Sequence, residues 1–203
     1  MQRSWGVRTI AWDVDDVLND LMREWFTRAW LPAHPTCSRT YDELTANPPH
    51  EVLGASREEF LSSLDAFRLQ HARSLAPSIP VLRWFEEHGP GFRHLAITAT
   101  PLHTSPISAG WVMEHFGRWI RTVSIIPSPR SFDTSPRYDA SKVDYLRWLG
   151  KVDLLIDDTE ANVAGASEAG FAAIVFPRPW NHARATVETT LAQLQSAILD
   201  LRA

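Results

Sequence analysis

Short apolar runs alternate with amphipathic segments along most of the chain. The first apolar run, residues 7–12, is too short for a helix and ends in carboxylates, as buried strands often do. Four more runs predict strands at residues 94–98, 122–126, 152–156 and 171–176. Helical spacing predicts helices at residues 81–88, 107–116, 141–148, 160–169 and 185–201. This alternation indicates an α/β fold, a Rossmann-like parallel sheet of about five strands with helices on both faces.

The segment between the first two predicted strands has a different pattern. Residues 19–30 have helical spacing, and Pro32 is expected to end that helix because its ring cannot continue one. Ser56 followed by Glu59 forms a capping-box pattern and predicts a second helix to about residue 72. The rest is polar and rich in proline, without a strand-like run. We therefore expect a small helical cap at residues 19–80, inserted into a Rossmann-like core of residues 1–18 and 81–203.

Composition narrows the class of protein. A length of 203 residues suits one domain with a modest insertion. The formal net charge of −4 argues against binding to a nucleic-acid polymer or a membrane surface, both of which call for a basic patch. The single cysteine, Cys37, excludes an internal disulfide and a cysteine-based zinc site. Because no apolar stretch has the length of a signal peptide or a membrane span, we expect a cytoplasmic protein.

Polar residues gather where three of the predicted strands end. They are Asp13, Asp15 and Asp16 after the first strand, Thr98 and Thr100 at the second, and Asp157 and Asp158 at the fourth. The carboxyl ends of parallel strands share one edge of the sheet, so these carboxylates are expected to crowd together and to need a cation. Oxygen ligands of high charge suit a hard ion such as Mg²⁺. The alternative for Asp158 is that it caps the helix that follows.

Four motifs in order make the chain resemble the haloacid dehalogenase superfamily. They are IAWDVDDVL at residues 10–18, LAIT at 95–98, Lys142 near a helix start, and LLIDD at 154–158. Within that superfamily the chain is most similar to the 5'(3')-deoxyribonucleotidase group. The similarity lies in DLLIDD at residues 153–158, WVMEHFG at 111–117, Pro101 after the second motif, and the small helical insertion.

The resemblance implies a role for each motif. Asp13 is the implied nucleophile, and Asp15 is the implied general acid and base. Mg²⁺ would bind Asp13, the main-chain carbonyl of Asp15, and Asp157, with Asp158 as a further or alternative ligand. Thr98 would bind a phosphate oxygen, although Pro101 points instead to Ala99 and Thr100. Lys142 would neutralise charge in the transition state, with Lys151 as the second choice.

The implied activity is Mg²⁺-dependent hydrolysis of small phosphomonoesters through an aspartyl-phosphate. Nucleoside or deoxynucleoside monophosphates are the favoured substrates. The alternatives are a phosphatase or phosphotransferase for a sugar phosphate or biosynthetic intermediate, and a non-catalytic phosphate-binding module. The expected partner is a small phosphorylated metabolite, and self-association into a homo-oligomer stays open. A helical cap of this kind is expected to close over the phosphate and to select the leaving group.

Two departures from the nucleotidase pattern bear on the substrate. Asp16 stands where that group has a glycine, and Leu21 stands where it has an aromatic residue that contacts the base. Trp25 and Phe26 follow one turn later and are the alternative aromatic contacts. Near the last strand, Arg178 is expected at the surface, with contact to a second anionic group as the alternative. These departures affect nucleotide specificity and leave the phosphatase motifs intact.

Overall fold

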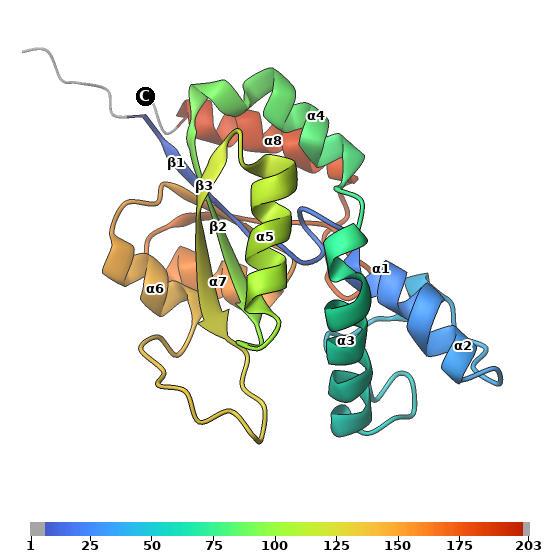
Figure 1. Ribbon diagram of the computed structural model, residues 1–203. Coiled ribbons are helices and arrows are strands. Elements are labelled where there is room, and N and C mark those ends of the chain that lie inside the picture. Colours follow the sequence, from blue (N-terminus) through green and yellow to red (C-terminus); the bar gives the residue numbers. More distant parts are fainter. Residues whose placement is uncertain (1–6, 201–203) are drawn as a thin grey trace, which may run out of the picture.

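A computed structural model describes residues 7–200, with side chains to residue 198. Five parallel strands form one sheet in the order β3-β2-β1-β4-β5 (Figure 1). The strands are β1 (Thr9–Trp12), β2 (Arg93–Thr100), β3 (Ile120–Pro127), β4 (Leu154–Asp157) and β5 (Ala172–Val175). The α/β Rossmann-like fold predicted from the sequence is confirmed.

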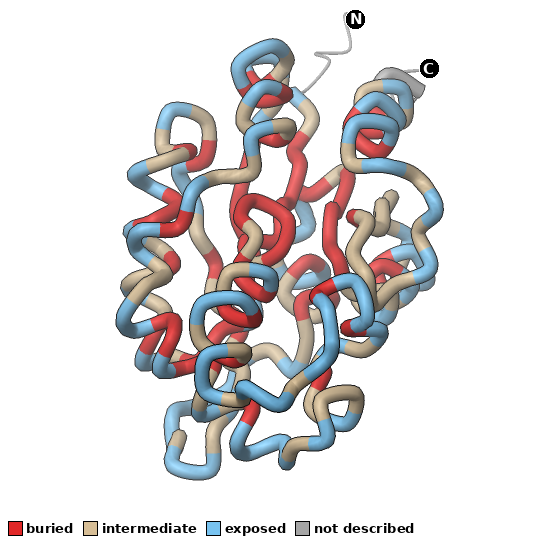
Figure 2. Tube along the Cα trace, turned by 90° about the vertical axis from the view of Figure 1, so that its right-hand side faces the viewer, coloured by how far each residue is buried: buried red, intermediate tan, exposed pale blue. Residues whose placement is uncertain are grey.

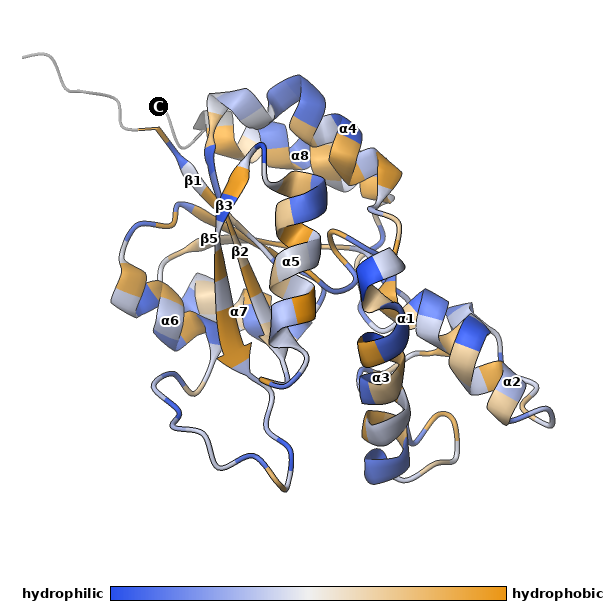
Figure 3. Ribbon diagram, in the orientation of Figure 1, coloured by the Kyte–Doolittle hydropathy of each residue, from blue (hydrophilic) through white to orange (hydrophobic). Residues whose placement is uncertain are grey.

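Helices cover both faces of the sheet. Successive residues of a strand point to opposite sides, so each strand contributes side chains to the packing on both faces. They are α4 (Ile79–His88), α5 (Ser105–Phe116), α6 (Lys142–Leu149), α7 (Glu160–Glu168) and α8 (Val187–Asp200). Ile10 and Trp12 of β1 pack in one hydrophobic cluster with α4, α5 and α8, whereas Ala11 packs in a second with α6. Figure 2 shows the buried strands in the interior, and Figure 3 shows much of strands β2 and β3 in hydrophobic colours. Within residues 7–200, no helix has the length and apolarity to span a membrane.

The segment between β1 and β2 is helical and lies beside the sheet layers (Figure 1). It contains α1 (Leu21–Trp25), a π-helix (Phe26–Trp30), α2 (Leu31–Ala33), α3 (Arg57–His71), and 3₁₀ turns at Tyr41–Glu43 and Ala72–Ser74. Its two ends meet, since the Ser78 amide donates to the Leu18 carbonyl at 2.8 Å and Asn19 forms an isolated bridge with Pro77. A cluster of buried aromatic residues fills its interior: Trp25, Phe26, Trp30, Phe60 and Phe67.

Two details of this segment differ from the prediction. Pro32 does not end the helix at Trp30, because the helical stretch continues through the π-helix into α2 and ends one residue after the proline, at Ala33. Ser56 does cap α3, since its Oγ accepts from the Glu59 amide at 3.1 Å. The Glu59 carboxylate, however, lies 3.1 Å from His34 Nε2, so the reciprocal half of the capping box is not formed.

Several element ends also differ by a few residues. Strand β2 continues two residues beyond the predicted end to Thr100, because β3 pairs with it through Thr100↔Pro127. Helices α4 and α5 each begin two residues early, with a proline in the first turn. The predicted last residue of the C-terminal helix, residue 201, lies outside the described residues.

Candidate active site

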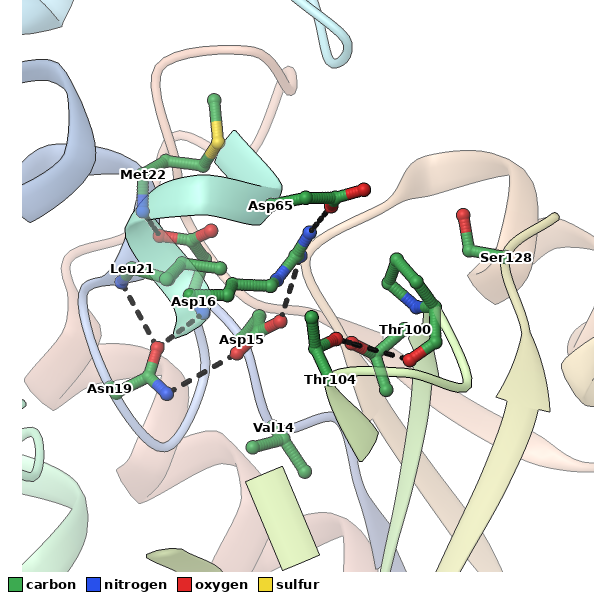
Figure 4. Close-up of polar contacts among 12 residues, drawn as sticks. Val14, Asp15, Asp16, Asn19, Leu21, Met22, Asp65, Thr100, Thr104 and Ser128 are labelled. Atoms are coloured by element: carbon green, nitrogen blue, oxygen red, sulfur yellow. Dashed lines mark hydrogen bonds and ion pairs between the residues drawn. The ribbon is translucent and has the colours of Figure 1, made fainter. Parts of the chain in front are cut away.

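One cavity lies between the carboxyl ends of the strands and helices α1 and α3, with a volume of about 200 Å³. The predicted site residues that line it are Asp13, Asp15, Thr98, Ala99, Lys142 and Asp158. Thr100 is outside this set, and its hydroxyl lies 3.0 Å from that of Thr104 (Figure 4). The exposed Lys151 is also outside it. Thr98 and Ala99 are therefore the second-motif residues that a ligand in the cavity would meet.

Lys142 joins the first and fourth motifs. It is the first residue of α6, whose N-terminus is capped by Ser141, and its side chain is 2% exposed. Its Nζ lies 2.7 Å from Asp13 Oδ2 and 2.7 Å from Asp157 Oδ2. Burial opposes the charged ammonium, but the attraction of the two carboxylates prevails and raises the pKa of Lys142. The lysine is thus a fixed cation between the two strand ends.

Asp13 is held at the end of β1 by both its backbone and its side chain. Its amide donates to the Ile156 carbonyl of β4 at 2.9 Å, and its Oδ1 accepts from the Val14 amide at 2.7 Å. Burial raises the pKa of Asp13 well above its usual value, and repulsion from Asp157 and Asp158 adds to this against the attraction of Lys142. A carboxylate in this position needs further positive charge to stay ionised.

The two carboxylates after β4 have different partners. Asp157 is fully buried, and its Oδ1 accepts from the Thr159 amide at 2.9 Å and from Asn162 Nδ2 at 3.0 Å. Asp158 Oδ2 accepts from Trp180 Nε1 at 2.7 Å, so its side chain does not cap the following helix. Burial and repulsion from Asp157 raise the pKa of Asp158 to about 7.

These carboxylates form a group that fits a divalent ion. Asp13, Asp157 and Asp158 each place an oxygen within 4.8 Å of the others. When ionised, three carboxylates against the single ammonium of Lys142 leave two negative charges in a buried site. A hard divalent cation with oxygen ligands would neutralise them. The carboxylate of Asp15 is not in this group, and the role predicted for its main-chain carbonyl stays a prediction.

The loop after β1 turns sharply at Asp16. This residue has a φ of 64°, in the left-handed region where glycine is favoured and aspartate is tolerated. Its Oδ1 accepts from the Met22 amide at 3.0 Å, and its own amide donates to Asn19 Oδ1 at 3.2 Å (Figure 4). Burial raises the pKa of Asp16 to about 7. The local bonds explain how aspartate replaces glycine here.

Three residues near Asp15 were not predicted from the sequence. Arg68 of α3 donates from Nη2 to Asp15 Oδ2 at 3.0 Å. Asp65, one turn earlier, accepts from Arg130 Nε and Nη2 at 2.6 and 2.7 Å. Arg130 lies in the loop after β3 and lines the cavity. The only sequence signal was the i, i+3 spacing of Asp65 and Arg68 within one helix, which is common on solvated faces.

The remaining expectations concern the cavity wall and the last strand. Trp25 and Phe26 pack inside the helical segment and do not line the cavity, whereas Leu21 and Phe60 do. The alternative aromatic contacts proposed for the base are therefore wrong. Arg178 is 8% exposed rather than a surface residue, and its guanidinium contacts the Asp16 carbonyl and the Asp20 carboxylate. It fixes the loop after β1.

Solved structures share this fold, although no protein-family model and no curated protein matches the sequence. A haloacid dehalogenase-like hydrolase from Streptococcus pneumoniae has a TM-score of 0.60 and 12% identity, over 95% of this chain and 98% of that one. A protein provisionally named phosphoglycolate phosphatase, from Lactobacillus delbrueckii subsp. bulgaricus, has a TM-score of 0.59 and 14% identity, over 95% of this chain and 98% of that one. Protein Tyrosine Kinase A of Mycobacterium tuberculosis has a TM-score of 0.57 and 14% identity, over 90% of this chain and 88% of that one.

The chain therefore has the fold of haloacid dehalogenase-like hydrolases. One fold can serve different reactions, and the names of these three proteins include both a phosphatase and a kinase. The activity of this chain has to be argued from its own site. The narrower resemblance to deoxyribonucleotidases stays a prediction.

Proposed function

We propose that the chain is a Mg²⁺-dependent hydrolase of small phosphomonoesters. The observation that carries this proposal is the buried group of Asp13, Asp157 and Asp158 around Lys142, beside a cavity. Such a group combines a nucleophile, carboxylate ligands for a divalent ion and a fixed cation. Phosphoryl transfer to a carboxylate needs all three, because nucleophile and substrate are both anions.

Each residue then has a chemical task. Asp13 attacks phosphorus and forms an aspartyl-phosphate, while Asp15 protonates the leaving oxygen and later takes a proton from the attacking water. Thr98 donates to a phosphate oxygen, and Lys142 stabilises the negative charge of the transition state. Asp13, Asp157 and Asp158 would hold Mg²⁺, which supplies charge neutralisation between nucleophile and phosphate when bound.

Residues 19–80 serve in this proposal as a small helical cap over a core of residues 1–18 and 81–203. The walls from α1 and α3 include Leu21, Phe60 and Leu64, which give the leaving group an apolar surface. Nucleoside monophosphates are the first substrate class to test, because Phe60 is an aromatic residue on that wall. A sugar phosphate or another biosynthetic intermediate is the alternative.

The test is hydrolysis of p-nitrophenyl phosphate with EDTA, and again after Mg²⁺ is restored. Activity should vanish with the chelator and return with the ion, and Asp13→Asn should abolish it. Asp42→Asn, an exposed carboxylate on the helical segment, is the matched control and should retain full activity. Hydrolysis that survives EDTA or Asp13→Asn would contradict the proposal. A panel of nucleotides and sugar phosphates then identifies the substrate class.

A further inference from the structure

The Asp15 carboxylate is bonded to a cation that comes from the helical segment. Arg68 Nη2 lies 3.0 Å from Asp15 Oδ2, and the Arg68 side chain is 9% exposed. Arg68 lines the cavity, and its buried Nε has no hydrogen-bond partner. The other contact of this carboxylate, Asn19 Nδ2 to Oδ1, is long at 3.4 Å (Figure 4). Arg68 is therefore the stronger of the two partners that orient Asp15.

Arg68 also contacts a carboxylate one turn earlier in its own helix. Its Nη1 lies 3.4 Å from Asp65 Oδ1, a contact as long as that of Asn19, and Asp65 in turn accepts two short bonds from Arg130 in the loop after β3. The chain Asp15–Arg68–Asp65–Arg130 therefore runs from the loop after β1, through α3, to a second core loop. Two guanidiniums alternate with two carboxylates, so the chain is neutral when all four are ionised. A partly buried chain of alternating charges of this kind restrains the orientation of each member.

We propose that Arg68 is a positioning residue that acts through Asp15, so that proton transfer by Asp15 depends on this contact from α3. The inference rests on the proposed function, because it takes Asp15 as the group that exchanges the proton. A guanidinium only donates, so Arg68 occupies Oδ2 and leaves Oδ1 to carry the proton.

The atoms balance in both steps of the reaction. In the first, the Asp13 oxygen bonds to phosphorus, the ester P–O bond breaks, and the proton on Asp15 Oδ1 passes to the leaving oxygen. In the second, water bonds to phosphorus, the bond to Asp13 breaks, and Asp15 Oδ1 takes the proton from water. Arg68 keeps its own protons throughout, and its contribution is the orientation of the carboxylate.

The experiment compares kcat/KM for two substrates, p-nitrophenyl phosphate and an alkyl phosphate such as glycerol 3-phosphate. The nitrophenolate leaves without a proton, whereas an alkoxide needs one. Arg68→Met should lower kcat/KM for the alkyl ester by about 100-fold, which is the lower end of the rate enhancement that general acid–base catalysis supplies. For the aryl ester the loss should be far smaller. Arg68→Lys should restore part of the loss. Arg73→Met, an exposed arginine a few residues later, is the matched control and should change neither.

A second comparison separates positioning from a structural role. In the Asp15→Asn background, Arg68→Met should cause no further loss specific to the alkyl ester, because its partner is already removed. Equal losses on both esters, or a full additional loss in that background, would overturn the inference. If Arg68→Met does not fold, Arg68→Lys carries the same comparison. If the wild type hydrolyses neither ester, or if Asp13→Asn hydrolyses them equally well, the proposed function is refuted instead.

Discussion

Lys142 is the residue on which the electrostatics of the site depend. Its Nζ lies 2.7 Å from both Asp13 and Asp157, and all three are buried. In EDTA, Lys142→Met should lower the free energy of unfolding by about 3–5 kcal/mol, since it leaves buried carboxylates without their cation. Lys151→Met, at an exposed lysine before β4, is the control and should cost little. Urea unfolding of the two variants measures the difference, and similar stabilities would contradict this role.

His94 makes the stability of the fold depend on pH. Trp12 Nε1 donates to its Nδ1 at 3.1 Å and its Nε2 donates to the Gly89 carbonyl at 2.9 Å, so the ring is neutral. Burial lowers its pKa to about 4. The unfolded chain binds this proton near pH 6.5. Between pH 4 and 6.5 the unfolded state therefore carries more protons, and folding stability falls as the pH falls.

The expected contribution of His94 is a loss of about 2 kcal/mol between pH 7 and pH 5. Buried carboxylates such as Asp158 act in the opposite direction because their pKa values are raised. The contribution is therefore read as the difference between the wild type and His94→Gln, each unfolded with urea at both pH values. A variant with the same pH dependence as the wild type would show that His94 does not titrate on unfolding.

At the residue scale, the sequence located the strand-end carboxylates because their position requires only local patterns. Asp13 and Asp157 each follow a short apolar run, and parallel strands bring such ends together. Arg68 and Arg130 carried no comparable signal. They reach the cavity through the way α3 and the loop after β3 pack, and sequence spacing holds no information about that contact.

Helix α5 has one glycine in its middle, Gly110, and one directly after its last residue, Gly117, and the two together test how the helix end is built. A Cβ at Gly117 would collide with the main-chain carbonyl oxygen of Met113, whereas a Cβ at Gly110 meets nothing within 4 Å. Gly117→Ala should therefore destabilise the protein by about 1–3 kcal/mol, as overpacking does. Gly110→Ala, in the exposed middle of the same helix, should stabilise it by up to about 1 kcal/mol. Thermal unfolding of both distinguishes them, and shifts of the same sign would refute this reading of the helix end.

At the element scale, the pattern of apolar residues predicted every strand of the sheet. Its errors lie mainly in the first and last residues of strands and helices. Helices α4 and α5 begin earlier than predicted because Pro80 and Pro106 are tolerated in a first turn. Strand β2 runs to Thr100 because its polar end pairs with β3. The helix starts depend on where a proline is tolerated, and the strand end depends on a neighbouring strand. The spacing of apolar residues contains neither kind of information.

At the scale of the whole molecule, the Asp65–Arg130 pair links α3 to the loop after β3. The Arg130 side chain is 8% exposed, and both of its bonds to Asp65 are short. Such bidentate pairs combine strength with a defined geometry. A link between residues so far apart in sequence holds α3 of the helical segment against the loop after β3.

Arg130→Gln should loosen this arrangement without unfolding the sheet. With one partner of the pair removed, the amides of α3 should exchange hydrogen faster, because local opening no longer breaks those bonds. The amides of β1 and β4 should exchange at the wild-type rate, since their ladder does not involve Arg130. Arg137→Gln, at an exposed arginine of the same loop, is the control. If exchange in α3 stays unchanged in Arg130→Gln, the closed position of the helical segment is set by its apolar contacts, and the ion pair contributes nothing to it.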